Sequence, residues 1–323
     1  MNDSPVLVSI IIPNYNHSKF IEDRIESILN QTYTCVEIII LDDHSTDNSQ
    51  EIIEKYRDCS NIKCIVFNET NSGSVFKQWK RGLQYAKGEL VWIAESDDLC
   101  KENFLEQIIP VFEDDEVVLA YTRSIDIDET GRPIGLSYMQ YEWCNYSFVK
   151  QGSQEIKDHL LYQCTIPNVS AVVFRNEVFE KSHLDHNFKL CGDWYFYSQI
   201  LEKGKIAYLS DPLSFHRFHS GSVRSKSRRS LSILEERLKI VNIIAQGKSV
   251  TLKNYIKAIR MQIEFYVNEV TLRDILGRKV WGLFKVVNKY NRYFVPFLPL
   301  IILKRICKRI FRSNYHLLSK DLR

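Results

Sequence analysis

Glycine is absent from the first 72 residues of this 323-residue chain, and the first one to appear is Gly73. A dinucleotide-binding GxGxxG turn and a phosphate-binding P-loop both require glycine, because the backbone must approach phosphate closely. Neither motif is therefore present in the first strand–helix turn. Phosphate bound here must instead be neutralised by a cation on carboxylates, or by basic side chains such as Lys77, Lys80 and Arg81.

Cysteine motifs and long apolar runs are missing as well. The eight cysteines are scattered, with no CxxC and no Cys/His metal spacing, which is typical of a protein of the reducing cytoplasm. The N-terminus lacks the basic region of a signal peptide. No stretch reaches the roughly 18 apolar residues of a membrane-spanning helix. We therefore expect a cytoplasmic protein.

The composition is that of a globular protein, with 45% hydrophobic and 12% aromatic residues. Its length exceeds that of a typical single domain, so one large domain with an appendage is expected. Strand and helix signals alternate over the first 120 residues, which predicts βαβ units and a mostly parallel α/β sheet. Strands are expected at 6–12, 36–41, 62–67, 90–94 and 117–121, and helices at 19–30 (capped by Ser18), 49–57 (capped by Asp47), 74–87 and 101–112.

The alternation ends after residue 125. Residues 126–152 are expected to form a long irregular segment, which is more typical of a functional lid or loop than of a linker. Order is expected to return with helices at 153–162 and 193–203 and strands at 171–174, 205–209 and 212–219. Beyond about residue 225 the chain is predicted to be helical to its end.

Two acidic clusters each follow an apolar run directly: Asp42-Asp43 after VEIIIL, and Glu95-Ser96-Asp97-Asp98 after LVWIA. Such runs predict strands buried on both faces, and ligands of open α/β sheets bind at the carboxyl ends of strands. Carboxylates there can hold a divalent cation, which in turn holds phosphate oxygens. The alternative is that these acids begin a turn or cap a helix. Two clusters at equivalent strand ends favour a nucleotide-phosphate site.

Six motifs extend this pattern in a fixed order: IIPNYN (11–16), LDDHSTDNS (41–49), NETNSGS (68–74), AKGELVWIAESDD (86–98), CGDWYFY (191–197) and FHRFHSGSVR (215–224). The set spans roughly residues 5–225 and resembles the family 2 glycosyltransferases, which are inverting, nucleotide-sugar-dependent enzymes of the GT-A fold that build bacterial surface polysaccharides. The resemblance implies a Rossmann-like GT-A catalytic domain at 1–225 and a helical extension at 226–323. It also implies a UDP-sugar donor and a lipid-linked or glycan acceptor, with no nucleic acid as partner.

The resemblance assigns the nucleoside of the donor to two loops. Pro13, Tyr15 and Asn16 would line the pocket after the first strand. Asp42 and Asp43 would bind the base and ribose, because a carboxylate accepts hydrogen bonds from a uracil N–H or a ribose hydroxyl. Tyr15 has a second interpretation, as an aromatic ring packed at the strand end.

The second acidic cluster stands at the DxD position of the family. Ser96, Asp97 and Asp98 match its diphosphate- and metal-binding residues, and Arg81 is expected to assist with the phosphates. Glu95 replaces the usual aspartate, which leaves its direct ligation open. A Mg²⁺ or Mn²⁺ ion is implied, acting as a Lewis acid on the diphosphate.

An R-x-H element near the end of the resemblance is implied to fold back over the diphosphate. Arg217 and His219 match it, and His219 would donate to a phosphate oxygen or complete the metal shell. Ser222 and Arg224 are expected in a loop that closes on the donor.

Asp193 matches the catalytic base of the family, which takes the proton of the acceptor hydroxyl. Gly192 stands where the family often has glutamate, so a second carboxylate is absent. The aromatic side chains of Trp194, Tyr195 and Tyr197 are expected to form an acceptor platform. The alternative for Asp193 is a plain helix cap.

The charge of the chain is unevenly distributed. Residues 278–323 carry twelve Lys or Arg and one acid, a balance of +11, whereas residues 1–277 carry 31 basic and 39 acidic residues, a balance of −8. The basic tail also contains aromatics and an apolar run at 295–303, which predicts peripheral attachment to the inner face of the cell membrane through anionic lipid. The alternative is an amphipathic helix packed on the protein itself.

Two rival functions remain open at this point. A nucleotidyltransferase on a similar sheet would make sugar nucleotide instead of consuming it, but the glycine-free N-terminus disfavours it. A non-catalytic assembly or binding protein on the same fold would be expected to lack acidic residues that are present here. The sequence favours a metal-dependent inverting glycosyltransferase.

Overall fold

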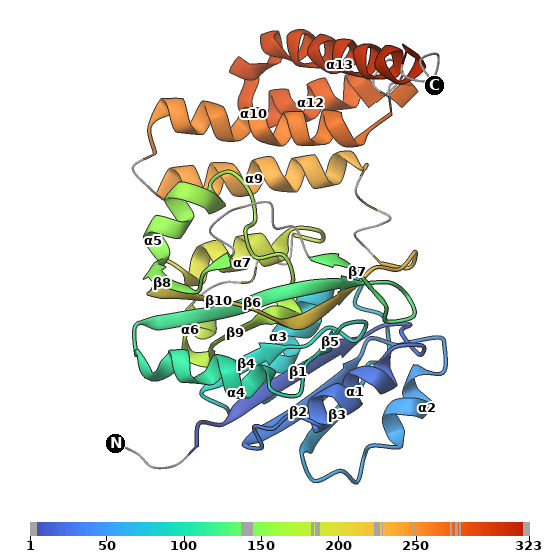
Figure 1. Cartoon of the computed structure of the whole chain (residues 1–323), viewed down its shortest axis with the longest axis vertical. Helices are drawn as coiled ribbons and strands as arrows, with labels where there is room; N and C mark the ends of the chain where they lie inside the picture. The colour runs from blue at the N-terminus through green and yellow to red at the C-terminus, as the bar shows by residue number, and fades with distance from the viewer. Residues whose placement is uncertain are drawn as a thin grey trace. The chain divides into compact units, whose positions relative to one another are not determined.

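Figure 1 shows a computed structural model of the chain, which describes residues 5–136, 145–181, 184, 188–222, 227, 229–247, 250–271, 273–274, 277 and 279–318. The side chains of 180, 181 and 309–318 are not described. The chain divides into two compact units, Met1–Leu160 with Cys164–Ser220, and Leu161–Gln163 with Gly221–Arg323.

The first unit is built on a mixed ten-stranded sheet with the order β3-β2-β1-β4-β9-β6-β10-β5, to which β7 is added beside β6 and β8 beside β10. The pairs β3/β2, β2/β1, β1/β4 and β6/β10 are parallel, whereas β9 is antiparallel to both β4 and β6, and β5 is antiparallel to β10. The strands are β1 Val8–Asn14, β2 Val36–Asp42, β3 Ile62–Phe67, β4 Leu90–Ile93, β5 Leu99–Cys100, β6 Val117–Ile127, β7 Pro133–Leu136, β8 Phe148–Gln151, β9 Val172–Arg175 and β10 Lys205–Arg217.

Helices cover both faces of the parallel half because its strands are apolar on both faces. Ile10 and Ile12 of β1 share a core with Ile25 of α1. Ile11 points to the other face, where α3 lies so close that a Cβ on Gly82 would come 2.4 Å from the Ile11 side chain. Helices α1 and α3 therefore cover opposite faces of β1 (Figure 1). The helices of this unit are α1 Ile21–Leu29, α2 Ser49–Glu54, α3 Val75–Tyr85, α4 Phe104–Ile108, α5 Gly152–Glu155, α6 Asn176–Lys181 and α7 Gly192–Ile200.

Three expectations about local structure were wrong. The segment 126–152 is not irregular throughout, because β6 continues to Ile127 and pairs with β7, and β8 precedes α5; residues 137–144 lie outside the described part. The strands expected at 205–209 and 212–219 are one strand, β10, with register shifts between Leu209 and Ser214. Ser18 does not cap α1; its N–H donates to Asp47 Oδ2, and the other oxygen of Asp47 accepts from Ser49 N.

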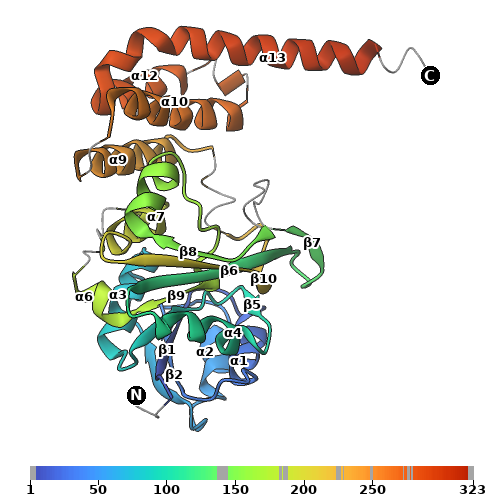
Figure 2. The same cartoon turned by 60° about the vertical axis from the view of Figure 1, so that its left-hand side comes forward.

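The second unit is helical, with α9 Leu231–Gly247, α10 Leu252–Glu269, α12 Lys279–Asn291, a 3₁₀ turn η5 Arg292–Phe297 and α13 Leu298–Leu318. In Figure 2, α13 runs past the other helices of its unit. Gln262 is fully buried in this unit, accepts from Arg237 Nε at 2.9 Å and donates to Tyr162 O at 2.7 Å. Its apolar core comes from α9, α10 and α12, through Leu234, Leu238, Val241, Ile259, Ile263, Leu283 and Val287.

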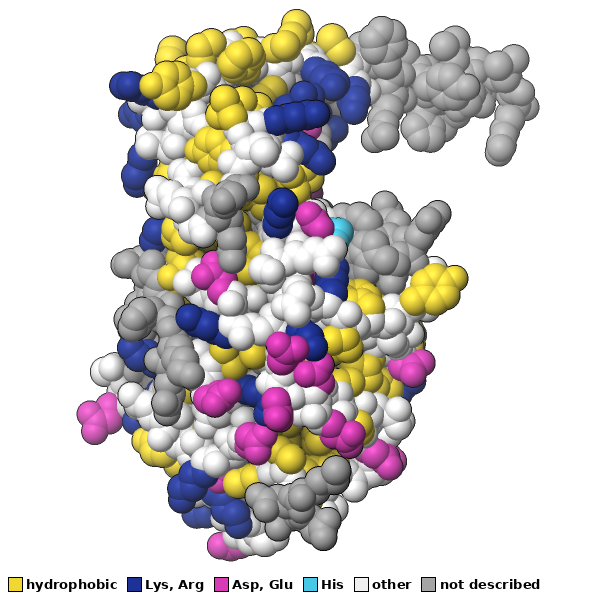
Figure 3. All heavy atoms as spheres, turned by 90° about the vertical axis from the view of Figure 1, so that its left-hand side faces the viewer, with side chains coloured by type: hydrophobic (Ala, Val, Ile, Leu, Met, Phe, Trp, Pro, Cys, Tyr) yellow, Lys and Arg dark blue, Asp and Glu magenta, His cyan; other side chains and the backbone are white. Residues whose placement is uncertain are grey.

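The C-terminal helices also present large apolar side chains to solvent. Trp281 is 71% exposed and Tyr293 74% exposed, and Phe297, Leu300 and Leu303 are also exposed. Figure 3 shows such side chains gathered over these helices, with Lys and Arg beside them. Among the residues that the structure describes, no helix combines the length and hydrophobicity needed to cross a membrane.

Candidate functional site

The carboxylate of Asp42 is buried at the end of β2 and is engaged by the protein on both oxygens. Asn14 Nδ2 donates to Oδ2 at 2.7 Å, and Ser45 donates through its hydroxyl at 2.5 Å and through its N–H to Oδ1 at 2.9 Å. Gln50 Nε2 adds a further bond to Oδ1 at 2.8 Å. Asp42 therefore holds the loop after β2 against the end of β1.

The carboxylate of Asp43 is equally engaged and organises the next loop. It accepts from Asn68 Nδ2 at 2.6 Å, from Ser72 N at 2.9 Å and from Gln78 Nε2 at 2.8 Å, all at Oδ1. Arg81 Nη1 donates to the oxygen of the same Asn68 amide. The predicted residues Asp43 and Arg81 are thus brought together through Asn68 instead of by direct contact with each other.

The loop after β1 supplies the exposed groups next to this network. Pro13 is buried, whereas Tyr15 is 45% exposed, so its ring is not a packed core aromatic. Asn16 has a positive φ of 57° and its Oδ1 accepts from Thr46 N at 2.7 Å, which ties this loop to the loop after β2. Tyr15 and Asn16 are therefore held at the surface by a braced pair of loops.

Glu95, the first residue of the second acidic cluster, is a half-buried acid. Its Oε1 accepts from Trp79 Nε1 at 2.9 Å, and its N–H donates to Ser170 Oγ at 3.1 Å. Burial, assisted by the negative charge of Asp97, raises the pKa of Glu95 to about 8. Glu95 is therefore protonated at neutral pH, and a neutral carboxylic acid is a poor cation ligand.

Asp98 turns toward β10. Its Oδ1 accepts from Arg217 N at 2.9 Å, and burial together with the charge of Asp97 raises its pKa. The side chain of Arg217 is also buried: Nε donates to Asp97 O at 2.7 Å and Nη1 to Glu129 O at 3.1 Å, with the guanidinium 4.9 Å from the Phe20 ring. Arg217 therefore fastens the acidic loop to β10 and to the turn after β6.

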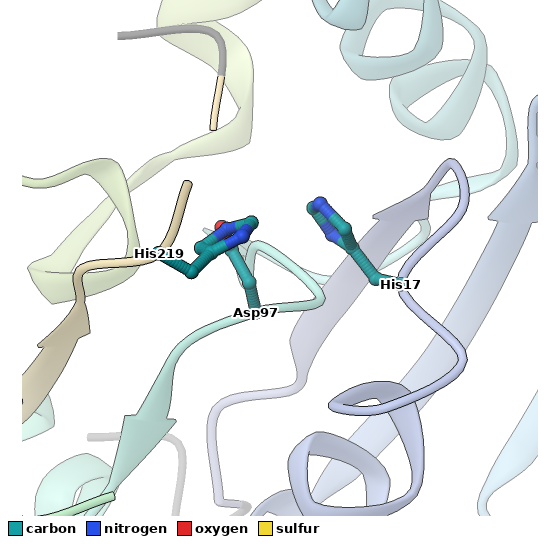
Figure 4. A group of neighbouring side chains, drawn as sticks. All are labelled: His17, Asp97 and His219. Atoms are coloured by element: carbon teal, nitrogen blue, oxygen red, sulfur yellow. The ribbon is translucent and has the colours of Figure 1, made fainter. Parts of the chain in front are cut away.

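Asp97 meets two histidines, one of which sequence reasoning missed. His219 Nε2 lies 2.9 Å from Asp97 Oδ2, and His17 from the loop after β1 joins them, so that one ligand atom of each residue lies within 4.8 Å of the others. Figure 4 shows the three side chains reaching toward one another from three segments. The only sequence signal for His17 was its position directly after the PNYN motif.

The electrostatics of this group suit a cation. Burial alone would raise the pKa of Asp97, but the hydrogen bond from His219 and the nearby His17 outweigh it, and the pKa is lowered. Burial lowers the pKa of His17, which favours a neutral imidazole. A carboxylate and neutral imidazoles are the donor types that bind divalent metals in proteins. Asp98 is not among the three converging side chains, and we leave it out of the cation site proposed below.

Asp193 stands at the start of α7, where its Oδ1 accepts from Trp194 N at 2.8 Å and its side chain is half-buried. The preceding Gly192 packs against Phe76, and a Cβ there would come 2.7 Å from the ring. The glutamate that the family often carries has no room at this position.

The expected acceptor platform was wrong for two of its three members. Trp194 is buried and donates from Nε1 to Leu160 O at 2.9 Å, and Tyr197 is fully buried. Tyr195, which stacks near Phe188, stays half-buried. Ser222 is half-buried after β10, and Arg224 lies outside the described residues.

Comparisons with known proteins bear on this geometry. Residues 9–182 match the model of the family described as Glycosyl transferase family 2. Over 252 residues the chain is 28% identical to an Escherichia coli protein named UDP-Glc:alpha-D-GlcNAc-diphosphoundecaprenol beta-1,3-glucosyltransferase WfaP, covering 77% of this chain and 92% of that protein.

Two solved structures share the fold. S. aureus TarS, residues 1–349 in complex with UDP-GlcNAc, superposes with a TM-score of 0.69 at 17% identity, covering 95% of this chain and 92% of that one. The mannosyltransferase PcManGT of Pyrobaculum calidifontis, in complex with GDP-Man and Mn²⁺, gives 0.62 at 13% identity, covering 96% of this chain and 88% of the other. The expected fold class is confirmed.

Proposed function

The chain belongs to glycosyl transferase family 2, and from that premise we propose that it transfers a sugar from a UDP-sugar to a lipid-linked or glycan acceptor with inversion at the anomeric carbon. The observation that carries the proposal is the convergence of Asp97, His219 and His17 at the carboxyl edge of the sheet, beside the braced loops after β1 and β2. A UDP-sugar is named because WfaP acts on UDP-Glc and TarS binds UDP-GlcNAc.

The donor would lie across the two braced loops. Tyr15 and Asn16 are the exposed groups that would contact the nucleoside, while Pro13 shapes the end of β1. Asp42 and Asp43 act mainly by holding these loops, because both carboxylates are already engaged by protein donors. Ser96, which follows β4, has its hydroxyl 2.8 Å from His17 Nδ1 in the loop after β1. Binding to a rigid pocket costs less ordering entropy than binding to a mobile one.

The residues at the sheet edge fit a divalent cation, which would be held by Asp97 and His219. When bound, the cation supplies Lewis-acid stabilisation of the charge that develops on the leaving UDP. Mg²⁺ and Mn²⁺ are the two candidates. Arg217 keeps the cation-binding loop in place through Asp97 O.

Asp193 is proposed as the general base. Its carboxylate takes the proton of the acceptor hydroxyl as the hydroxyl oxygen attacks the anomeric carbon, and the bond from that carbon to the diphosphate breaks with its electron pair leaving on UDP. One displacement of this kind inverts the configuration. The hydrogen bond from Trp194 N holds Oδ1, which orients the carboxylate.

The test is release of UDP from UDP-Glc or UDP-GlcNAc in the presence of an undecaprenyl-diphosphate sugar acceptor and Mn²⁺. Asp193→Asn should lower kcat by about 10²-fold or more, the usual range for loss of a general base, with donor Kd nearly unchanged. Asp158→Asn, an exposed acid on the same unit, is the matched control. Synthesis of UDP-sugar from UTP and sugar phosphate would instead favour the nucleotidyltransferase, and donor binding without UDP release would favour a binding protein.

We also propose that the C-terminal helices attach the enzyme to an anionic membrane surface. The exposed Trp281, Tyr293 and Phe297 stand beside the exposed basic residues Lys285 and Arg292. Aromatic and aliphatic side chains enter the headgroup region, and each Lys or Arg near an anionic surface contributes about 1 kcal/mol. Attachment of this kind would keep the enzyme at the surface that holds a lipid-linked acceptor.

Flotation of the full chain with phosphatidylglycerol vesicles tests the attachment. The triple variant Trp281→Ser, Phe297→Ser and Leu300→Ser should lose most of the bound fraction. The control is Ile134→Ser, Leu136→Ser and Val149→Ser, which removes three apolar side chains of the first unit that are 51–59% exposed, against 56–71% for those of the test variant. Equal flotation of the two triple variants would contradict the proposal.

A further inference from the structure

Three protein side chains lie close enough together to bind a single cation without the help of a nucleotide. His17, Asp97 and His219 offer ligand atoms within 4.8 Å of one another, from the loop after β1, the loop after β4 and the end of β10 (Figure 4). Bonds of about 2.0–2.2 Å from one metal ion hold its ligand atoms no more than about 4.4 Å apart. Small side-chain adjustments are therefore enough to bring all three onto one ion.

We propose that His17 is a third protein ligand of the cation, so that the site binds Mn²⁺ without nucleotide and prefers Mn²⁺ to Mg²⁺. The inference deepens the proposed function, because the cation is the one that serves the donor diphosphate. Mg²⁺ favours oxygen ligands and gives up its waters reluctantly, whereas imidazole nitrogen suits transition metals. Two imidazoles and one carboxylate thus select against Mg²⁺.

The surroundings of His17 are those of a held ligand. Its Nδ1 lies 2.8 Å from Ser96 Oγ, and metal-binding histidines commonly use their second ring nitrogen to bond a neighbouring oxygen in this way. The Phe20 ring packs edge-on against both imidazoles, with centroids 6.0 Å from His17 and 5.0 Å from His219. These contacts hold the orientation of both imidazole rings, so binding a cation would require little side-chain reorganisation.

His17 also connects the cation to the donor pocket. It follows Tyr15 and Asn16 in the loop after β1, and this loop is tied to the loop after β2 through Asn16 and Thr46. A cation bound by His17 fixes the loop that would contact the nucleoside. Metal binding and nucleotide binding should then favour each other, in both directions and by the same factor.

The first experiment titrates Mn²⁺ into the full chain without nucleotide and follows the electron paramagnetic resonance signal of free aqueous Mn²⁺. The wild-type chain should bind one ion. His17→Ala should weaken binding by at least the roughly 10–100-fold that loss of an outer-shell partner costs. Ser96→Ala should cause a smaller loss of the same sign, and His159→Ala, a histidine outside the site, should bind as the wild type does.

The second experiment changes the ligand type. His17→Asp replaces an imidazole by a carboxylate, so competition between Mg²⁺ and Mn²⁺ should shift toward Mg²⁺. A circular dichroism melt of each variant checks folding, and His17→Gln replaces His17→Ala if the latter does not fold.

The inference is overturned if the His17 variant binds Mn²⁺ as the wild type does without nucleotide, or if its only loss is in UDP affinity. The proposed function fails separately, if wild type with bound Mn²⁺ releases no UDP.

Discussion

Glu95→Gln should stabilise the metal-free protein increasingly as the pH rises. Glu95 is half-buried, and its pKa is raised to about 8 from an ordinary value of 4.5, first by desolvation and then by the charge of Asp97. Between these two pH values the folded state holds a proton that the unfolded state has released. The free energy of unfolding of the wild type therefore falls with rising pH, by up to about 1.4 kcal/mol per pH unit from this one group.

The magnitude follows from the width of that window. At pH 7 the cost of keeping Glu95 protonated is about 3 kcal/mol relative to a side chain that never ionises, and it levels off above about pH 8. Glutamine is such a side chain, and its Oε1 can still accept from Trp79 Nε1, as Glu95 does. The stability of Glu95→Gln relative to wild type should therefore rise by about 2–3 kcal/mol between pH 5.5 and pH 7.5.

Urea unfolding in EDTA at a series of pH values measures this difference. The quantity compared between two pH values is the difference in free energy of unfolding between Glu95→Gln and wild type. Any effect of the amide that does not depend on pH cancels in this comparison. Glu102→Gln, on an exposed residue of the same unit, should follow the wild-type profile at all pH values. Parallel profiles for wild type and Glu95→Gln would refute the reasoning, because Glu95 would then titrate alike in the folded and unfolded states and would be an ordinary ionised candidate for the cation site.

Three further outcomes follow from contacts at the site. Arg217→Met should lower the free energy of unfolding by about 1–3 kcal/mol in urea without ligands, because it removes the donors to the partly buried carbonyls of Asp97 and Glu129. An unchanged stability with weakened UDP binding would make Arg217 a diphosphate ligand instead. Gly192→Ala should cost about 1–3 kcal/mol through overlap with the Phe76 ring, and Phe76→Leu should recover part of that loss in the double variant. Asp98→Asn keeps an oxygen for Arg217 N and should retain Mn²⁺ binding, whereas Asp97→Asn should weaken it at least about tenfold; equal losses would return Asp98 to the cation site.

The parallel half of the sheet was predictable because the apolar composition of its strands indicates that they are buried. β1 and β2 are buried at every position, and each contains a run of three isoleucines within a mostly apolar sequence. The antiparallel strand β9 has only four residues, and nothing in Val172–Arg175 indicates which neighbours it pairs with. Strand β10 was split in the prediction because Ser210-Asp211-Pro212 has the composition of a turn, yet the sheet absorbs these residues as register shifts.

The sequence predicted only those members of the candidate site that belong to a family motif. Asp97 and His219 follow from the family pattern and lie together. His17 required the fold, since its ring lies 5.3 Å from that of His219 although three strands separate β1 from β10 in the sheet. Trp194 and Tyr197 were assigned to the surface because α7 is aromatic on several sides, and sequence alone does not show which side the core takes. Asp42 and Asp43 show a further limit of prediction from sequence. A carboxylate at a strand end can accept hydrogen bonds from the protein's own donors instead of from a ligand, and the sequence does not distinguish the two cases.

The order in which the chain emerges during synthesis gives the three-segment site a further property. Asp97 and His219 are 122 positions apart in the sequence, and His219 stands at the end of β10, the last strand of the sheet. A nascent chain folds from its N-terminus as it leaves the ribosome, so the parallel half, with the two loops proposed to contact the nucleoside, can form while β10 is still inside the exit tunnel. Such an intermediate would have the surfaces for a nucleoside but neither His219 nor the Arg217 brace. The chain would then bind metal only once the sheet is complete. A partly synthesised chain would therefore not hydrolyse the sugar donor.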